Sequence, residues 1–300
     1  MSDSLPPDRK AYPVSVVIPT LGGESLVGTI EQLNRGTVIP AEILVCIPKE
    51  EASRVDNLAF QNIRIIQTPC RGQVAQRSCG FGCAEQPLVL QLDDDTALKP
   101  EDLHKLIQAL YRLGHGNAVA PIYHDSMTGH CLHAYHRRIV GWLQNLYAFL
   151  VCNVPWGAKR MGVISSAGVG YGVDENHCGS ELVEVQWQPG GCVLCYREDL
   201  IKEDFYPFPG KAYCEDLIHS LLRRKRGVRL WILPGAYCTT SASPMPFSWS
   251  SIKAEMRARG YVVRLSGGKT WRLALWCITD MLKRVAFAVA SWALPNGRLK

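Results

Sequence analysis

Leu88-Val-Leu-Gln-Leu-Asp-Asp-Asp-Thr96 is a short apolar run that ends in three consecutive carboxylates. A run of this length and hydrophobicity predicts a buried β-strand. Because ligands of open α/β sheets bind beyond the carboxyl ends of strands, we expect Asp93, Asp94 and Asp95 in that crevice. Crowded carboxylates need a neutralising cation, and hard oxygen ligands suit Mg²⁺ or Mn²⁺. The stretch therefore indicates a metal-assisted site for a diphosphate; a simple turn or helix cap is the alternative.

Strand and helix patterns alternate on both sides of this stretch. This β-α alternation predicts an α/β fold with a mostly parallel sheet flanked by helices. Neither GxGxxG nor GxxxxGK[ST] is present, which argues against a dinucleotide oxidoreductase and a P-loop enzyme. The predicted strands are 14–18, 42–47, 63–67, 88–92 and 119–122, and the predicted helices are 24–34, 72–85 and 100–113.

A second acidic site follows in a less regular half of the chain. Glu215 and Asp216 begin a predicted helix, downstream of a Gly190-Gly191 turn that would let a ligand approach the backbone. Carboxylates also stabilise helix N-termini, which is the structural alternative. The other elements expected here are a helix over 137–151, a glycine-rich loop over 157–179, strands at 183–187, 192–196 and 228–233, and a helix over 215–226.

The composition is that of a protein with a substantial core and a basic surface. The 300 residues are 47% hydrophobic and carry a formal net charge of +6. Basic clusters at 223–229 and 253–272 suit a phosphorylated substrate, anionic lipid or nucleic acid, or are simply solvated. The polar N-terminus has no signal peptide pattern, so the twelve cysteines are expected to be cytosolic thiols.

The C-terminal segment 271–294 combines apolar and basic residues. Its apolar run, 285–294, is short of the roughly 20 residues that span a bilayer. The pattern predicts an amphipathic helix at a membrane surface, or one packed on the core or a second subunit. On a helix, one side would carry Trp271, Leu275, Ile278, Leu282, Ala286 and Val289.

Several motifs in order resemble family 2 glycosyltransferases. They are Val14–Thr20, Gln76-Arg77-Ser78, the aspartate triplet, Trp187 with Gly190-Gly191, Arg197, and Glu215-Asp216 with Leu222-Arg223 and Gly227. The resemblance implies a GT-A fold over residues 12–265, with a nucleotide half to about 122 and an acceptor half from about 123. Residues 1–11 would then be a disordered N-terminus and 266–300 an amphipathic helical tail. It also implies inverting sugar transfer with a divalent metal.

The resemblance implies roles for the donor side. Arg77 would approach the diphosphate or shape the donor site, and Asp95 and Asp93 would bind the metal as a DxD motif. Pro19, Thr20, Asp93 and Asp94 would complete the donor nucleotide site.

On the acceptor side, Asp216 would be the general base and Glu215 would position the acceptor. Trp187, Gly190, Gly191 and Arg223 would contact the acceptor, although Trp187 could equally pack in the core. An inverting displacement needs these two acidic sites, one to take the hydroxyl proton and one to hold a cation against the leaving diphosphate.

The chain also departs from the family pattern. Residues 45–49 lack the aspartate that reads the nucleobase, and 237–241 lack the metal-binding histidine, although Thr240 is near that position. The QxxRW motif of processive synthases is absent, which favours a single addition.

We therefore expect an inverting, metal-dependent hexosyl- or deoxyhexosyltransferase, peripheral on the cytoplasmic face of the membrane, with Mg²⁺ or Mn²⁺. It would use a nucleotide-sugar donor and a sugar or lipid-linked sugar acceptor in glycolipid or cell-surface polysaccharide synthesis, with no nucleic-acid partner. The alternatives are a nucleotidyltransferase that activates a sugar phosphate, disfavoured because loop 20–24 has no Lys or Arg, and an inactive sugar-binding relative. The donor sugar, nucleobase, linkage and oligomeric state stay open.

Overall fold

A computed structural model describes residues 11–133, 141–153, 155, 161–179, 181–241 and 248–293. The disordered N-terminus expected over 1–11 therefore lies, apart from Ala11, outside the described residues. So do the first residues of the helix expected over 137–151, part of the loop expected over 157–179, and the end of the tail.

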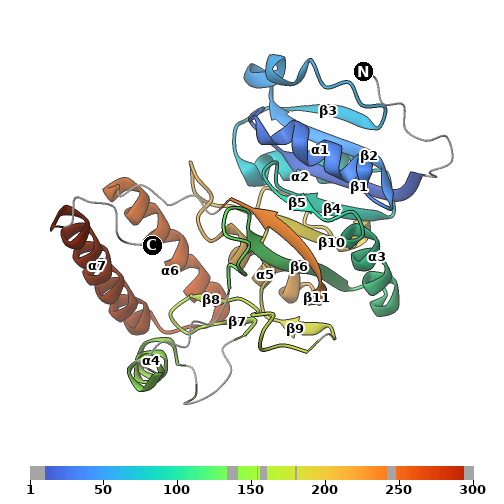
Figure 1. The fold of residues 1–300 in the computed structure, drawn as a ribbon. Coiled ribbons are helices and arrows are strands. Elements are labelled where there is room, and N and C mark those ends of the chain that lie inside the picture. The colour runs from blue at the N-terminus through green and yellow to red at the C-terminus, as the bar shows by residue number, and fades with distance from the viewer. Residues whose placement is uncertain are drawn as a thin grey trace.

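The sheet confirms the predicted α/β class. Strands β1 (Ala11–Pro19), β2 (Ile39–Pro48), β3 (Ile63–Thr68) and β4 (Leu88–Leu92) pair in parallel, as the β-branched and apolar runs predict. The order is β3-β2-β1-β4-β10-β6-β11-β5, and β9 pairs with β11 (Figure 1). The remaining strands are β5 (Ala97–Leu98), β6 (Asn117–Asp125), β9 (Val183–Val185), β10 (Cys192–Tyr196) and β11 (Arg229–Thr240).

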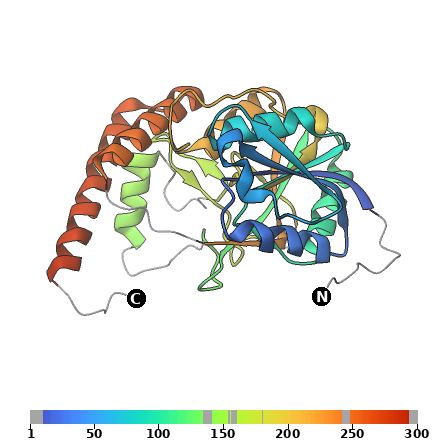
Figure 2. The same cartoon turned by 90° about the horizontal axis from the view of Figure 1, so that it is seen from above.

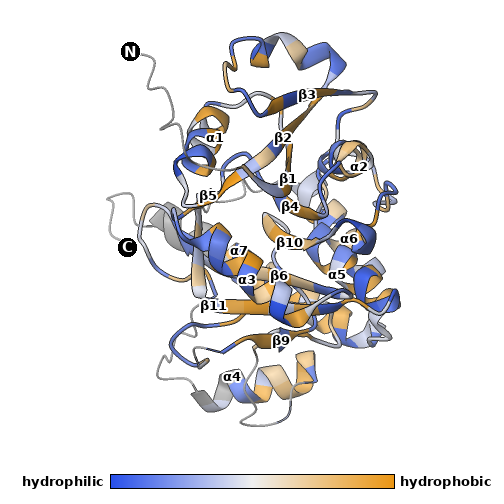
Figure 3. Cartoon of the chain, turned by 90° about the vertical axis from the view of Figure 1, so that its right-hand side faces the viewer, coloured by the Kyte–Doolittle hydropathy of each residue, from blue (hydrophilic) through white to orange (hydrophobic). Residues whose placement is uncertain are grey.

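Helices cover both faces of the sheet because successive strand side chains point to opposite sides. On β1, Val16 packs in one cluster with α1 (Ser25–Arg35) and α3 (Asp102–Leu113), whereas Val17 packs in another with Phe81 of α2 (Gln73–Cys83). Seen from above, α1 and α2 lie on opposite sides of the strands (Figure 2). The hydrophobic residues gather along the strands between these layers (Figure 3).

β10 interrupts the parallel pairing in the interior of the sheet, whereas β5 and β9 pair antiparallel with β11. β10 is hydrogen-bonded antiparallel to both β4 and β6. Because of that direction, the beginning of β10 meets the carboxyl end of β4, with Cys192 opposite Leu92. The Gly190-Gly191 turn is thereby brought next to the aspartate triplet.

The prediction that the last strand stops at Pro234 is wrong. β11 continues to Thr240, with a register shift against β6 between Leu233 and Tyr237. An irregularity of this kind accommodates a residue that cannot donate a ladder hydrogen bond. The loop expected over 157–179 likewise contains two short paired strands, β7 (Val163–Ile164) and β8 (Gly170–Tyr171).

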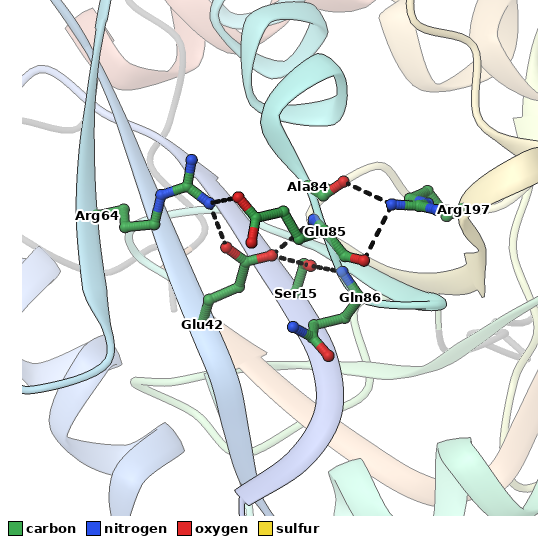
Figure 4. A network of polar contacts seen from close by, with 7 residues as sticks. All are labelled: Ser15, Glu42, Arg64, Ala84, Glu85, Gln86 and Arg197. Atoms are coloured by element: carbon green, nitrogen blue, oxygen red, sulfur yellow. Dashed lines mark hydrogen bonds and ion pairs between the residues drawn. The ribbon is translucent and has the colours of Figure 1, made fainter.

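A polar network fixes the end of α2 against the sheet, at the opposite end from the aspartates (Figure 4). The buried carboxylate of Glu42 accepts hydrogen bonds from Ser15 Oγ at 2.5 Å and from the Glu85 backbone N–H at 2.7 Å, and pairs with Arg64 at 2.8 Å. Arg197, at the end of β10, donates to the Glu85 carbonyl at 2.9 Å. A buried carboxylate with this many partners is satisfied structurally and carries no reactive role.

Helices α4 (Gly141–Tyr147), α6 (Trp249–Ser266) and α7 (Thr270–Ala293) form a lobe beside the sheet (Figures 1 and 2). A π-helical turn, Ala148–Cys152, follows α4. Helix α5 (Glu215–Lys225) links the lobe to the sheet, because Leu217 and Leu221 pack against Val262 of α6. Among the described helices, none is both long and apolar enough to cross a bilayer. Short 3₁₀ helices occupy Lys49–Val55 and Arg197–Asp199.

Candidate active site

The aspartate triplet follows β4 at the carboxyl edge of the sheet, as the sequence predicts. Asp93 donates its backbone N–H to the carbonyl of Gly191 at 2.8 Å. Asp94 Oδ2 accepts the Thr20 hydroxyl at 2.5 Å, and the Asp94 carbonyl accepts Thr29 Oγ1 at 2.9 Å. Asp95 is exposed. The carboxylates thus have different surroundings, and Asp95 is the most open to solvent.

Arg77 joins the two acidic sites. From α2 its Nη1 pairs with Glu215 Oε1 at 2.6 Å, and its Nη2 pairs with Asp93 Oδ1. Its side chain is 3% exposed, and burial lowers its pKa, but the two carboxylates raise that pKa to a net value above the ordinary one. The resemblance led us to expect that Arg77 approaches the diphosphate or helps to shape the donor site. The structure encloses it between Asp93 and Glu215, a position from which it holds the two acidic sites in place.

The Gly190-Gly191 turn lies between the same two sites. A Cβ atom on Gly190 would lie 2.5 Å from Glu215 Oε1, and one on Gly191 would lie 3.0 Å from Asp93 Oδ2. A side chain at Gly190 would displace Glu215, and one at Gly191 would crowd Asp93. The structure therefore brings the predicted glycines together with both acidic sites.

Glu215 and Asp216 begin α5 as predicted. Cys214, the residue before them, has φ 54°, which turns the chain sharply into the helix. Asp216 Oδ1 accepts the backbone N–H of Leu217 at 2.8 Å. Burial, and next the charge of Glu215, raise the pKa of Asp216 to about 7, against smaller opposing effects of Arg259 and Arg77. A carboxyl with such a pKa can accept a proton near neutral pH.

A cavity of about 580 Å³ opens beside the triplet. Three of the predicted donor residues line it, namely Pro19, Thr20 and Asp94. Two cations that the sequence analysis missed, Arg71 and Lys211, line it as well. The remaining lining residues are Leu21, Gly23, Gly72, Gln73, Gln76, Gly210 and Ala212.

The N-terminus of α2 faces this cavity. Gly72, with φ 152°, precedes the helix, and Gln76 reaches back to donate to the carbonyls of Thr20 and Cys46, each at 2.7 Å. The helix start is thereby fixed to the ends of β1 and β2. Helix N-termini favour anions, and Arg71 and Lys211 add positive charge. The cavity can therefore hold a phosphorylated ligand. An Arg-Gly pair directly before a helix is the sequence signal that would have indicated it.

Residues 15–161 match the family model for Glycosyl transferase family 2. The chain carries a glycosyl transferase family 2 domain. This assigns it to the glycosyltransferases, as the motifs predict. No curated protein sequence matches the chain.

Two solved structures are similar to the chain. The crystal structure of GalNAc-T7 with UDP, GalNAc and Mn²⁺ aligns with a TM-score of 0.59 and 15% identity, over 84% of this chain and 48% of that one. The crystal structure of S. aureus TarS aligns with a TM-score of 0.48 and 15% identity, over 83% and 39%. The first similarity confirms a GT-A-type fold. The chain spans about half the length of GalNAc-T7.

Two residues predicted at the acceptor of this glycosyltransferase are buried elsewhere. Trp187 is 6% exposed; it packs against Leu217 and donates from Nε1 to the Tyr171 carbonyl at 2.9 Å. Arg223 is 2% exposed, and its Nη2 lies 3.9 Å from Cys195 Sγ. Both side chains serve the packing of α5, so the structure does not support contact with an acceptor. For Trp187 the core-packing alternative is the one observed.

The family 2 domain offers few protein ligands for a cation. Within the described ranges, no group of three or more His, Cys, Asp or Glu side chains is arranged to hold a metal. Asp93 Oδ1 is already engaged by Arg77 and by Gln73 Nε2. Asp95 is exposed as a residue, but partial desolvation of its carboxyl and the charges of Asp93 and Asp94 raise its pKa, and hydrogen bonds with its own backbone and with Thr240 offset part of that rise. These oxygens fit an ion that takes one or two carboxylates and completes its shell with phosphate and water.

Proposed function

We propose that this glycosyltransferase moves a sugar from a nucleotide-sugar donor to an acceptor hydroxyl, with inversion at the anomeric carbon and Asp216 as the general base. The observation that carries the proposal is the half-buried carboxyl of Asp216, whose pKa is raised to about 7. That carboxyl is next to Glu215, which Arg77 pairs to Asp93. Through Arg77 and Glu215, the proposed base is held at a defined position relative to Asp93 on the proposed donor side.

The donor diphosphate would occupy the cavity beside the triplet. Its negative charge would lie near Arg71, Lys211 and the N-terminus of α2. Thr20 and Asp94, which are hydrogen-bonded to one another, would contact the nucleoside. The similar protein GalNAc-T7 was crystallised with UDP, GalNAc and Mn²⁺, so a nucleoside diphosphate is the first ligand to test.

The displacement needs a proton acceptor and a stabilised leaving group. The acceptor oxygen bonds to the anomeric carbon while the bond from that carbon to the diphosphate oxygen breaks, and the diphosphate leaves with the electron pair. Asp216 takes the hydroxyl proton, and Glu215 orients the acceptor beside the Gly190-Gly191 turn. Arg71 and Lys211 stabilise the charge that develops on the diphosphate.

A divalent metal would be held by Asp95 together with the donor phosphates, with Thr240 beside it. When bound, Mg²⁺ or Mn²⁺ supplies Lewis-acid stabilisation of the leaving diphosphate. The absence of a histidine over 237–241 and the engagement of Asp93 by Arg77 favour a metal bound mainly through phosphate. Metal affinity is therefore expected to be low without nucleotide and much higher with it.

A thermal-shift panel tests the proposal. UDP and other nucleoside diphosphates should raise the unfolding midpoint, and should raise it more with Mn²⁺ than without, because ligands that bind only the folded state stabilise it. The variant Arg71→Ala/Lys211→Ala should lose most of the shift, whereas the control Arg224→Ala/Lys225→Ala, far from the cavity, should keep it. A panel in which no nucleoside diphosphate changes the midpoint would contradict the donor site. Pyrophosphate release from a nucleoside triphosphate and sugar phosphate would instead favour a nucleotidyltransferase.

A further inference from the structure

An apolar stripe runs along the outer side of α7. Five side chains at helical spacing, three or four residues apart, share this side, and each is 39 to 65% exposed. We define the α7 stripe by these residues: Trp271, Leu275, Ile278, Leu282 and Val285. Phe149 and Leu150, both 48% exposed, lie close to it because Arg272 donates to their backbone carbonyls.

The opposite side of α7 is fixed to the rest of the protein. Arg284 pairs with Glu255 of α6 at 3.1 Å, and the Arg259 guanidinium lies 4.1 Å from the centre of the Trp276 ring. Arg259 also donates to the Gly168 carbonyl at 2.8 Å. The stripe therefore points outward because the other side of the helix is already packed, and α6 and α7 form the outer part of the lobe (Figures 1 and 2).

The net charge of the chain is concentrated on these two helices. Residues 249–293 contain eight Lys or Arg and two Asp or Glu, a formal net charge of +6, which equals that of the whole chain. Both acids, Glu255 and Asp280, are paired within the lobe to Arg259 and Arg284. In the described part of the chain, no salt bridge joins an acid to the other six cations. These are Lys253, Arg257, Arg264, Lys269, Arg272 and Lys283.

We propose that α7 docks on an anionic lipid surface, with the α7 stripe in the interface and the cations at the headgroups. An amphipathic helix with exposed Trp, Leu and Ile and a basic polar side binds in this way. Each Lys or Arg near an anionic membrane adds attraction. A second copy of the chain is a poorer partner for the stripe, because two such lobes would bring like charges together with no free acid to offset them.

The docking places the transferase site at a membrane surface. Val262 of α6 packs against Leu217, the residue after Asp216, so the lobe and the base are parts of one packed unit. If the proposed function holds, the acceptor is a lipid-linked sugar at that surface. The docking itself does not depend on the transfer reaction, so it can be tested separately.

Vesicle sedimentation of the full chain tests this inference. Binding is expected to vesicles of phosphatidylcholine with phosphatidylglycerol and to be much weaker with phosphatidylcholine alone. The variant Ile278→Glu/Leu282→Glu should lower the partition coefficient by about tenfold or more, because two apolar side chains no longer enter the interface. A matched control, Val27→Glu/Met127→Glu, makes the same charge change at exposed apolar residues elsewhere and should lower binding far less.

Three results would overturn the inference. The first is that the full chain does not bind anionic vesicles. The second is that the stripe variant and its control lose vesicle binding to the same extent. The third is that the chain self-associates in sedimentation velocity and that only the stripe variant abolishes this self-association. The last result would assign the stripe to a second copy. Nucleoside diphosphate binding by the stripe variant should be unchanged, so failure of docking is distinguishable from failure of the donor site.

Discussion

The two acidic sites of this protein differ in how they are solvated. At the end of β4, Asp94 is hydrogen-bonded to Thr20, and Asp95 faces solvent. At the start of α5, Glu215 is buried against Arg77, and burial and Glu215 raise the pKa of Asp216. The pKa values of Asp94 and Asp95 are raised as well, but the oxygens of Asp95 are open to a cation, whereas Asp216 is less exposed and its pKa of about 7 suits proton transfer. The difference is the reason we propose the first site for the donor and the second for the acceptor hydroxyl.

The largest expected effect comes from removing the proposed base. Asp216→Asn should lower kcat by about 10² to 10⁴, the usual contribution of general base catalysis, while donor binding is retained. Steady-state transfer assays and nucleotide thermal shifts measure the two properties. The exposed Asp56→Asn is the matched control. If Asp216→Asn kept full activity, the buried site would have no role in proton transfer.

Arg77→Met should have the next largest effect, on stability. It leaves Asp93 and Glu215 without their shared cation, and loss of one partner of a buried ion pair costs about 3–5 kcal/mol in the free energy of unfolding. Chemical denaturation measures this loss. Arg77→Met/Glu215→Gln should recover part of it, whereas no recovery would mean that the two acidic sites are not coupled through Arg77.

The pH dependence of turnover tests whether Asp216 acts as the base. Asp216 must be ionised to accept a proton, so kcat/KM should rise with pH up to about 7 and fall about tenfold per pH unit below that. A pH-independent rate between 5 and 8 would contradict the base assignment.

The contribution of Asp216 to the free energy of unfolding should fall as pH rises, whereas its contribution to turnover should grow. The folded-state pKa of Asp216, about 7, is raised above the ordinary 3.8, so folding favours the protonated carboxyl. Its stabilising contribution is complete below the unfolded-state pKa and is lost as pH rises through about 7. Denaturation of wild type and Asp216→Asn at several pH values isolates this contribution, because the variant lacks it.

The smallest of these effects is expected at the open site. Asp95→Asn should raise the Mn²⁺ concentration for half-maximal turnover at least about tenfold, because a carboxylate ligand is lost while donor phosphates still bind the ion. Asp94→Asn is the control, since Asp94 is engaged by Thr20. Equal shifts in the two variants would show that the triplet does not divide its roles as proposed.

The sequence predicts the first half of the fold well, because its runs have a simple period. The β-branched residues of β1 and the apolar residues of β4 mark buried strands directly. It fails at β11, where Pro234 looks like an end and the irregular pairing with β6 that accommodates it depends on a distant strand. Local patterns indicate what a segment can form, and tertiary pairing decides where it stops.

Some site residues could be predicted from the sequence, and others depend on tertiary contacts that the sequence does not show. The position of the aspartates could be predicted because strand ends meet at one sheet edge, and the place of Pro19 and Thr20 beside them follows from the family resemblance. The pairing of Arg77 with Glu215 could not, since 138 positions separate them in the chain. Arg71 and Lys211 were missed because basic residues in loops are common. For Trp187 the sequence left two alternatives, because an aromatic ring suits a core as well as a sugar, and the structure shows core packing.

The antiparallel strand β10 has a consequence for how the protein folds. The family match ends at residue 161, yet β4 and β6 are held together through β10, which starts at Cys192. A fragment restricted to the matched region would leave two interior strands with bare edges, a state prone to aggregation. We therefore expect that residues 15–161 do not fold on their own, and that calorimetry of the full chain records the two halves of the sheet melting in one cooperative transition.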